Sequence, residues 1–350
     1  MKRVVVVLLF ALGLFASSTA AQQTTPPAPA TPREAKVPQP VERTLANGLR
    51  VIVVPKSDIP LVAARLTVRT GAAADPKNRE GVAALTSTVL TKGTKTRTAE
   101  QIARGVEALG ATLESAAGYD SSIVDLSVMS PNFAKAMEFV ADTVRNATFA
   151  KDEVERERQQ KLDELQVTLR EPRPLADMVM ARLLFADAPY GHNVAGTPAS
   201  LKAIKREDLA KYHATYYVPN NAILVVGGDV KPEAAFALAE KLFGSWKKAN
   251  VAPAPSQQRR AAGASRVVVV DMPDAGQAAV VIGRQGIRRT DATYLPALVA
   301  NSVLGGGYSA RLNQEIRIKR GLSYGARSAF SPRADVGPFT ASTQTKNESA

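Results

Sequence analysis

The most informative stretch of this chain is Gly81-Val-Ala-Ala-Leu-Thr-Ser-Thr-Val-Leu-Thr-Lys-Gly-Thr94, which predicts a helix over about residues 81–90. Two runs rich in Val, Ile and Leu precede it, at residues 49–54 and 61–68. Short apolar runs of this kind predict β-strands, and the turn Asp58-Ile-Pro60 joins them. Two strands followed by a helix indicate the α+β class.

The rest of the first half continues this alternation of strands and helices. Thr98-Ala-Glu-Gln101 is a capping box, the pattern that opens a helix, and this helix is expected to end near Gly110. Val124, Leu126 and Val128 alternate with polar residues, as in a strand with one buried face. Helical patterns follow at residues 132–144, 152–169 and within 175–185.

The order of elements begins again in the second half. We expect strands at 267–270, 278–282 and 323–330, and helices at 293–303 and 308–320. The repeated order of strand, strand and helix indicates an internal duplication, although the identity between the halves is low. The chain is therefore expected to fold as two homologous α/β-sandwich domains, at residues 43–248 and 266–350, joined by a Pro-containing linker at 249–265.

The composition is that of a folded globular protein with two domains. The chain has 350 residues, and a single hydrophobic core rarely grows beyond about 250. Its formal net charge is +13, but Lys and Arg are dispersed among Asp and Glu, and no aromatic-basic motif appears. We therefore expect no nucleic-acid site. The absence of cysteine excludes disulfides and thiol catalysis.

The N-terminus has the pattern of an export signal. Lys2-Arg3, an apolar run at 4–16 and small residues at 17–21 form the zones of a secretory signal peptide, expected at 1–21. The apolar run is shorter than the ~20 residues that span a bilayer, so we expect cleavage and no stable membrane span. An uncleaved anchor is the alternative. The Pro-rich residues 22–42 are expected to form an extended tether, and the periplasm is the expected destination.

Six segments resemble, in the same order, the insulinase/pitrilysin-like family of zinc metallopeptidases, which are inverzincins. They are residues 45–54, residues 70–94, Pro189-Tyr-Gly-His-Asn-Val-Ala-Gly-Thr197, Tyr217-Val-Pro-Asn-Asn-Ala-Ile-Leu-Val-Val-Gly-Gly-Asp229, Leu304-Gly-Gly-Gly-Tyr-Ser-Ala-Arg-Leu312 and Glu315-Ile-Arg-Ile-Lys-Arg-Gly-Leu-Ser-Tyr324. The resemblance implies two α+β domains that face one another as half of a clamshell. The family's second domain continues past the position of Ala350, so this domain is expected to be truncated or reduced.

The resemblance also implies a missing metal site. In the family pattern H-x-x-E-H, two histidines on one helix hold zinc and the glutamate activates water. Here these positions are Ala84, Ser87 and Thr88, so we expect no metal and no general base in this chain. Glu164 matches the family's distal zinc-binding glutamate, and we expect it to be an unused carboxylate on a helix surface.

The histidines give a second argument against zinc, which needs no family knowledge. His192 and His213 are the only two, and no cysteine is present to add a ligand. Their separation of 21 residues does not fit the three- or four-residue spacing of a helical ligand pair. We expect both to be structural or exposed. The alternative is a rearranged metal site that combines Glu164 with one of them.

The catalytic residues that the resemblance implies lie in the second half. Arg317 and Tyr324 coincide with the family's arginine and tyrosine pair, which positions the substrate and polarises the scissile carbonyl. Such donors stabilise developing oxyanion charge. The alternatives are an exposed basic residue and a half-buried strand aromatic. Gly305, Gly306 and Gly307 lack the lysine and hydroxyl residue of a P-loop, and we expect a flexible turn that lines the chamber.

These features predict an exported, non-catalytic subunit of a two-chain zinc metallopeptidase that is inactive alone. An H-x-x-E-H partner subunit of the same family is expected to supply zinc and the general base. This chain is expected to supply Arg317, Tyr324 and a wall of the chamber. The substrates are unfolded peptides, bound by strand addition to a sheet edge. The alternative is an inactive peptidase-like scaffold or a peptide-holding protein.

Overall fold

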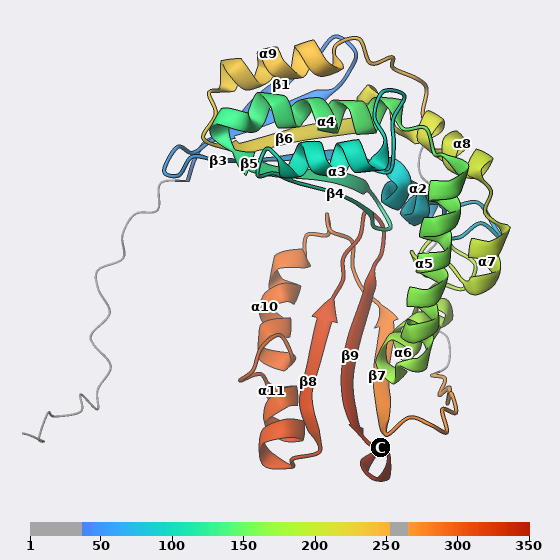
Figure 1. The fold of residues 1–350 in the computed structure, drawn as a ribbon. Coiled ribbons are helices and arrows are strands. Elements are labelled where there is room, and N and C mark those ends of the chain that lie inside the picture. Colours follow the sequence, from blue (N-terminus) through green and yellow to red (C-terminus); the bar gives the residue numbers. More distant parts are fainter. Residues whose placement is uncertain (1–36, 253–264) are drawn as a thin grey trace, which may run out of the picture. The chain divides into compact units, whose positions relative to one another are not determined.

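The computed structural model describes residues 37–252 and 265–350 (Figure 1). The signal peptide expected at 1–21, the tether up to residue 36 and residues 253–264 of the expected linker lie outside the described residues. Residues Pro38–Ala350 form one unit. It contains one mixed β-sheet, one antiparallel β-sheet and the helices that pack on them. No described helix is both long enough and apolar enough to cross a membrane.

The first sheet has six strands in the order β1-β2-β6-β3-β5-β4. β6 runs parallel to β2 on one side and antiparallel to β3 on the other, and the remaining pairs are antiparallel. The strands expected at 49–54, at 61–68 and around Val124–Val128 are confirmed. The six strands are β1 (Val41–Thr44), β2 (Arg50–Pro55), β3 (Leu61–Val68), β4 (Thr112–Ala117), β5 (Ser122–Met129) and β6 (Ala222–Gly228).

Helices α3, α4 and α9 lie along the first sheet, and α2 packs against β4 and β5 and against α5 and α8 (Figure 1). The capping box expected at Thr98 is confirmed. Its side chain accepts a hydrogen bond from the Gln101 N–H, and the Gln101 side chain accepts one from the Thr98 N–H. The helices of the first half are α2 (Val82–Leu90), α3 (Ala99–Glu107), α4 (Phe133–Asn146), α5 (Lys151–Arg170), α6 (Pro172–Phe185), α7 (Pro198–Ala203), α8 (Arg206–Tyr216) and α9 (Pro232–Phe243).

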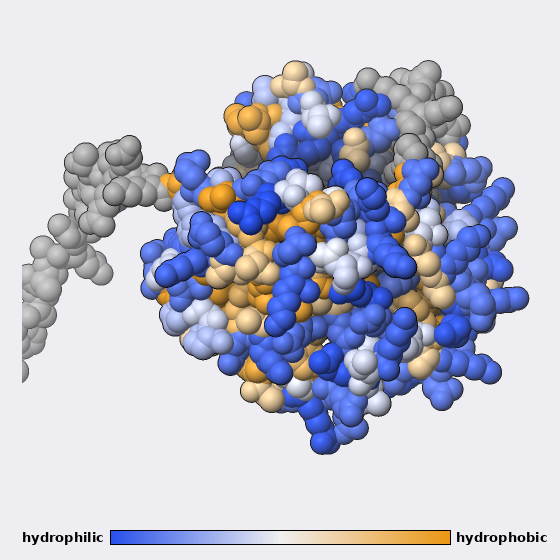
Figure 2. Space-filling model, turned by 90° about the horizontal axis from the view of Figure 1, so that it is seen from above, coloured by the Kyte–Doolittle hydropathy of each residue, from blue (hydrophilic) through white to orange (hydrophobic). Residues whose placement is uncertain are grey.

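The core of the first half lies between this sheet and its helices. Its largest fully buried side chains include Leu49, Leu66, Leu85, Leu224 and Phe243. Burial of a side chain of this size contributes roughly 1.5–3 kcal/mol to folding. On the face shown in Figure 2, hydrophilic side chains are interspersed with smaller apolar patches.

The second sheet has three antiparallel strands in the order β7-β9-β8. In chain order the elements are β7 (Gln277–Gln285), α10 (Tyr294–Leu304), α11 (Arg311–Asn313), the π-helix η4 (Gln314–Lys319), β8 (Ser323–Phe330) and β9 (Pro338–Lys346). This is the chain order of β3, α2, α3, β4 and β5, whose sheet order is β3-β5-β4. The repeated topology supports the expected duplication.

Two expectations for the second half are wrong. Residues 267–270 do not form a strand, since no described strand lies beside them to complete a hydrogen-bond ladder. The helix expected at 308–320 spans only residues 311–319, because Ala310 has extended backbone angles. Most of this shorter helix is π-helical.

Candidate functional site

Helix α2 holds the three positions of the missing zinc motif, and their side chains are not metal ligands. Ser87 is fully buried, and its Oγ lies 3.2 Å from the Tyr217 hydroxyl. Thr88 donates its hydroxyl hydrogen to the carbonyl of Ala84 at 3.0 Å, within the helix. Zinc in proteins is held by thiolates, imidazoles and carboxylates, and these three side chains offer none of them. The residues at this position therefore do not fit a zinc ion.

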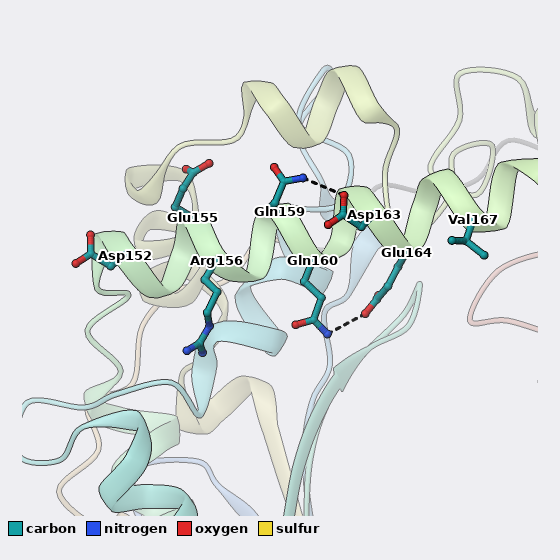
Figure 3. Close-up of a pocket in the computed structure, with 8 residues that line it drawn as sticks. All are labelled: Asp152, Glu155, Arg156, Gln159, Gln160, Asp163, Glu164 and Val167. Atoms are coloured by element: carbon teal, nitrogen blue, oxygen red, sulfur yellow. Dashed lines mark hydrogen bonds between the residues drawn. The ribbon is translucent and has the colours of Figure 1, made fainter.

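Glu164 lies on α5, on the surface shown in Figure 3. Its carboxylate accepts hydrogen bonds from Lys161 Nζ at 2.7 Å and from Gln160 Nε2 at 3.1 Å. The bond from Lys161 is the main reason why the pKa of this carboxyl lies below its usual value. All the side chains drawn in Figure 3 belong to α5, so this surface is one face of a single helix rather than an enclosed site.

The two histidines make local contacts with backbone carbonyls. His192 Nδ1 lies 3.1 Å from the carbonyl oxygen of Asn193, and His213 Nε2 lies 2.7 Å from that of Val144. Burial lowers the pKa of His213. Across residues 37–252 and 265–350, no three His, Cys, Asp or Glu side chains lie close enough together to hold a metal ion. The rearranged site with Glu164 therefore has no support in this part of the chain.

Asp75 holds the start of α2 from the preceding loop. Its Oδ2 accepts a hydrogen bond from the Gly81 N–H at 2.7 Å, and its Oδ1 accepts one from the Ala83 N–H at 2.9 Å. Gly81 has a φ of 101°, a conformation that residues with side chains rarely adopt. Burial raises the pKa of Asp75 to about 7, although both N–H donors act in the opposite direction.

Replacement of Asp75 by Asn is expected to remove a pH dependence from the stability of the fold. Between about pH 4, the pKa of an unfolded Asp, and pH 7, the folded protein keeps a proton that the unfolded chain releases. The contribution of Asp75 to the free energy of unfolding is therefore largest at the acid end of this window and is lost as the pH rises. Urea unfolding of both proteins at several pH values measures the difference, and a difference that does not change with pH would contradict the assignment.

Arg317 and Tyr324 lie together in the second half. The guanidinium carbon of Arg317 is 4.6 Å from the centre of the Tyr324 ring and 5.0 Å from the centre of the Tyr308 ring. A guanidinium within about 6 Å of an aromatic face is attracted to it. Tyr324 lies on the edge strand β8 and is 88% exposed, and Tyr308 is 65% exposed. Arg317 is thus held by two tyrosines that face solvent.

The charge of Arg317 is not neutralised within the described part of the chain. The neighbouring cation Lys319 pairs with Glu315 one helical turn before it, whereas Arg317 makes no ion pair with any described residue. An arginine held by aromatic rings keeps its N–H groups available for a carbonyl or carboxylate oxygen. Arg317 therefore has the properties of a ligand-binding residue.

Asn313 connects the segments that carry the two tyrosines. This buried side chain donates a hydrogen bond to the carbonyl of Tyr308 at 2.6 Å. Its Oδ1 also lies 3.4 Å from the backbone nitrogen of Ala326, two residues after Tyr324. Asn313 therefore fixes the relative position of the α10–α11 turn and the start of β8.

Of the three glycines expected to line the chamber, Gly305 has the closest contact with β8. Its carbonyl accepts a hydrogen bond from the Ser328 N–H at 3.0 Å, and a Cβ at this position would lie 2.3 Å from that nitrogen. Gly306 is similarly crowded by Ser302, whereas a Cβ at Gly307 would meet open space. The glycine turn therefore allows close packing of α10 on β8.

Tyr308 and Asn313 are site residues that the sequence motifs above do not predict. Tyr308 directly follows Gly307 in one of the segments that resemble the family, so its position is a usable signal. Asn313 gave no signal, because its two backbone partners are separated by 18 residues in sequence and meet only in the folded chain.

Comparisons with known proteins agree with this picture. Residues 50–198 match the sequence model of the insulinase family, peptidase family M16, and residues 203–350 match that of the peptidase M16 inactive domain. An uncharacterized zinc protease of Rickettsia bellii is 30% identical over 312 residues, which are 87% of this chain and 73% of the relative. An uncharacterized zinc protease of Mycobacterium tuberculosis is 31% identical over 315 residues, which are 89% of this chain and 71% of that relative.

Two solved structures show the same fold. A peptidase M16 inactive domain from Pseudomonas fluorescens is 29% identical, with a TM-score of 0.82 over 89% of this chain and 75% of that one. The periplasmic protease PqqL from Escherichia coli is 19% identical, with a TM-score of 0.72 over 91% of this chain and 36% of that one. The chain therefore belongs to the insulinase family of peptidases, and its residues 203–350 are an M16 inactive domain.

Proposed function

We propose that this chain is the exported, non-catalytic subunit of a two-chain zinc metallopeptidase. A partner subunit of the same family, with an intact H-x-x-E-H helix, supplies zinc and the general base. This chain supplies Arg317 and Tyr324 to the substrate, and Gly305, Gly306 and Gly307 belong to the chamber wall around them. The missing metal ligands on α2 and the retained pair on the inactive domain support this division of labour.

The observation that carries the proposal is the state of Arg317. It lies against two solvent-facing tyrosine rings and has no ion pair among the described residues. In a peptidase the negative charge develops on the oxygen of the scissile carbonyl. Fixed donors directed at that oxygen stabilise the transition state more than the substrate, and this lowers the barrier. The guanidinium of Arg317 and the hydroxyl of Tyr324 are such donors.

The proposed substrates are unfolded peptides. β8 is an edge strand, and Tyr324 lies near its start. On its outer side the N–H groups of Ala326 and Ser328 are already bonded to Asn313 and Gly305, so an extended peptide would pair with the start of the strand, around Tyr324. Strand addition recognises the backbone more than the side chains and therefore suits substrates of varied sequence. The charged and apolar N-terminal residues support export to the periplasm.

The second candidate function is a scaffold or peptide-holding protein with no part in hydrolysis. The replacement of all three motif residues on α2 favours it as much as it favours the subunit. The two candidates differ in the need for Arg317 and Tyr324, because only hydrolysis requires fixed donors at the scissile carbonyl.

Affinity purification of the tagged chain from its own organism tests the proposal. The expected eluate contains a second family member with H-x-x-E-H, about one zinc per pair of chains, and hydrolysis of a fluorogenic peptide. A partner that carries no such helix, or an eluate free of zinc, would leave the scaffold as the better account.

A further inference from the structure

The loop that connects β8 to β9, residues 331–337, contacts the first half of the chain. The Ala334 N–H donates a hydrogen bond to Asp120 Oδ2 at 2.9 Å, and the Asp335 N–H donates one to the Tyr190 hydroxyl at 3.1 Å. Tyr190 in turn donates its hydroxyl hydrogen to Asp120 Oδ1 at 2.6 Å. Two backbone groups of the loop are therefore bonded to one pair of side chains in the first half.

The side chain of Arg333, in the same loop, lies among three aromatic rings of the first half. Its guanidinium carbon is 3.7 Å from the centre of the Tyr119 ring, 4.5 Å from that of Tyr190 and 5.7 Å from that of Phe185. The ring of Tyr190 packs edge to face against each of the other two. A guanidinium within about 6 Å of an aromatic face is attracted to it, more strongly when water is excluded. These three rings, the aromatic cluster, therefore bind Arg333.

The aromatic cluster is fixed within the first half. The Tyr119 hydroxyl donates a hydrogen bond to the carbonyl of His192 at 2.7 Å, and the Tyr119 carbonyl accepts one from the Ala73 N–H at 2.9 Å. The side chains of Ala73, Phe185 and Tyr190 are buried against one another. Three separate segments of the first half therefore hold the rings in place.

The loop is fixed just as firmly within the second half. The Arg289 N–H donates a hydrogen bond to the carbonyl of Arg333 at 3.1 Å, and Arg288 Nε donates one to Asp335 Oδ1 at 2.8 Å. The loop also follows directly on β8, the strand that carries Tyr324 near its other end. A displacement of Arg333 from the aromatic cluster is therefore expected to move β8 with it.

The contact made by Arg333 is a balance of opposing effects. Burial lowers the pKa of Arg333, because the charged guanidinium loses hydration. Its Nη1 is buried and has no hydrogen-bond partner in the part of the chain that the structure describes. The attraction to the rings is thus partly offset by the lost hydration. Loss of the side chain is therefore expected to loosen the contact between the halves and to leave each half folded.

We propose that Arg333 is a positioning residue, which holds the second half against the aromatic cluster of the first half and so sets where Arg317 and Tyr324 lie in the chamber. Its effect on turnover rests on the proposed function, whereas its effect on the position of the second half does not. A misplacement of about 1 Å can lower a reaction rate on the order of 100-fold. Arg333 can therefore affect catalysis without touching the substrate.

Distances between the halves test the proposal on the full chain alone. The chain has no cysteine, so Ala103→Cys on α3 and Val299→Cys on α10 provide two exposed sites for spin labels. Double electron–electron resonance is expected to give a narrow distribution of distances, which Arg333→Ala broadens. Arg289→Ala is the matched control, because Arg289 lies 3.9 Å from the ring of Tyr294 within its own half. It should leave the distribution unchanged.

Turnover by the two-chain complex tests the consequence for catalysis. Arg333→Ala is expected to lower kcat about tenfold or more with little change in KM, because substrate still binds while the donors are misplaced. Arg333→Lys keeps the cation but not the planar face, so it should recover part of the loss and broaden the distances less. Arg289→Ala should leave turnover unchanged.

Two results would overturn the proposal. One is a distribution of distances that Arg333→Ala does not change. The other is full turnover by Arg333→Ala in a complex that Arg317→Ala inactivates. Failure of the proposed function gives a different pattern, in which Arg317→Ala leaves turnover unchanged while Arg333→Ala still broadens the distances. That pattern would support the role of Arg333 in holding the halves together and overturn its role in catalysis.

Discussion

Replacement of Arg317 by alanine is expected to lower peptide turnover by the two-chain complex about 100-fold, while the complex still assembles. The reason is electrostatic. Loss of one fixed donor to a developing oxyanion raises the barrier by roughly 3 kcal/mol in a site that excludes water. The substrate carbonyl is neutral before reaction, so kcat is expected to fall more than the affinity for the substrate. Steady-state kinetics of the purified complex measure both.

Tyr324→Phe removes only the hydroxyl and keeps the ring that lies 4.6 Å from Arg317, so a smaller loss of turnover is expected. Arg311→Ala is the matched control, since this exposed arginine lies six residues earlier on the same helical segment. It should leave kcat unchanged. Full turnover with both Arg317→Ala and Tyr324→Phe would show that the pair has no catalytic role.

Ser87→Glu is expected to destabilise the fold by more than about 3 kcal/mol rather than to restore a catalytic group. Ser87 is completely buried, and its hydroxyl lies 3.2 Å from that of Tyr217, whose side chain is also buried. A glutamate at this position needs more volume and brings a charge into the buried space beside the Tyr217 hydroxyl. Urea unfolding of the purified variant measures the change.

Ser87→Ala is the control for the loss of the hydroxyl alone. It removes the hydrogen bond between Ser87 and the Tyr217 hydroxyl, which keeps Ser122 as a partner, so the expected cost is about 0.5–1.5 kcal/mol. If the glutamate variant is as stable as the alanine variant, position 87 has room for a carboxylate, and our account of why α2 cannot regain its motif fails.

The strands and helices that can be predicted from the sequence are those with strong local signals. β3 and β8 have the predicted bounds, and the Thr98 capping box forms as expected, since alternation and capping depend on neighbouring residues. Residues 267–270 have an equally strong strand pattern and do not form a strand. A strand needs a hydrogen-bonded partner, and the presence of that partner is not written in the segment itself.

The candidate site, too, could be predicted from the sequence only in part. The resemblance points to Arg317 and Tyr324, and in the structure the guanidinium carbon of Arg317 lies 4.6 Å from the centre of the Tyr324 ring. The Tyr308 ring, on the other hand, reaches Arg317 because Asn313 connects the turn at Tyr308 to Ala326 of β8. Such contacts depend on how α10 packs on β8, a tertiary property that no local pattern encodes.

The measurement that tests the central claim most directly is peptide hydrolysis by this chain alone, by its H-x-x-E-H partner alone and by their mixture, at equal zinc concentration. The account predicts activity only in the mixture, because zinc and the general base belong to one chain and Arg317 and Tyr324 to the other. Hydrolysis by this chain alone, or equal activity of the partner without it, would contradict the account.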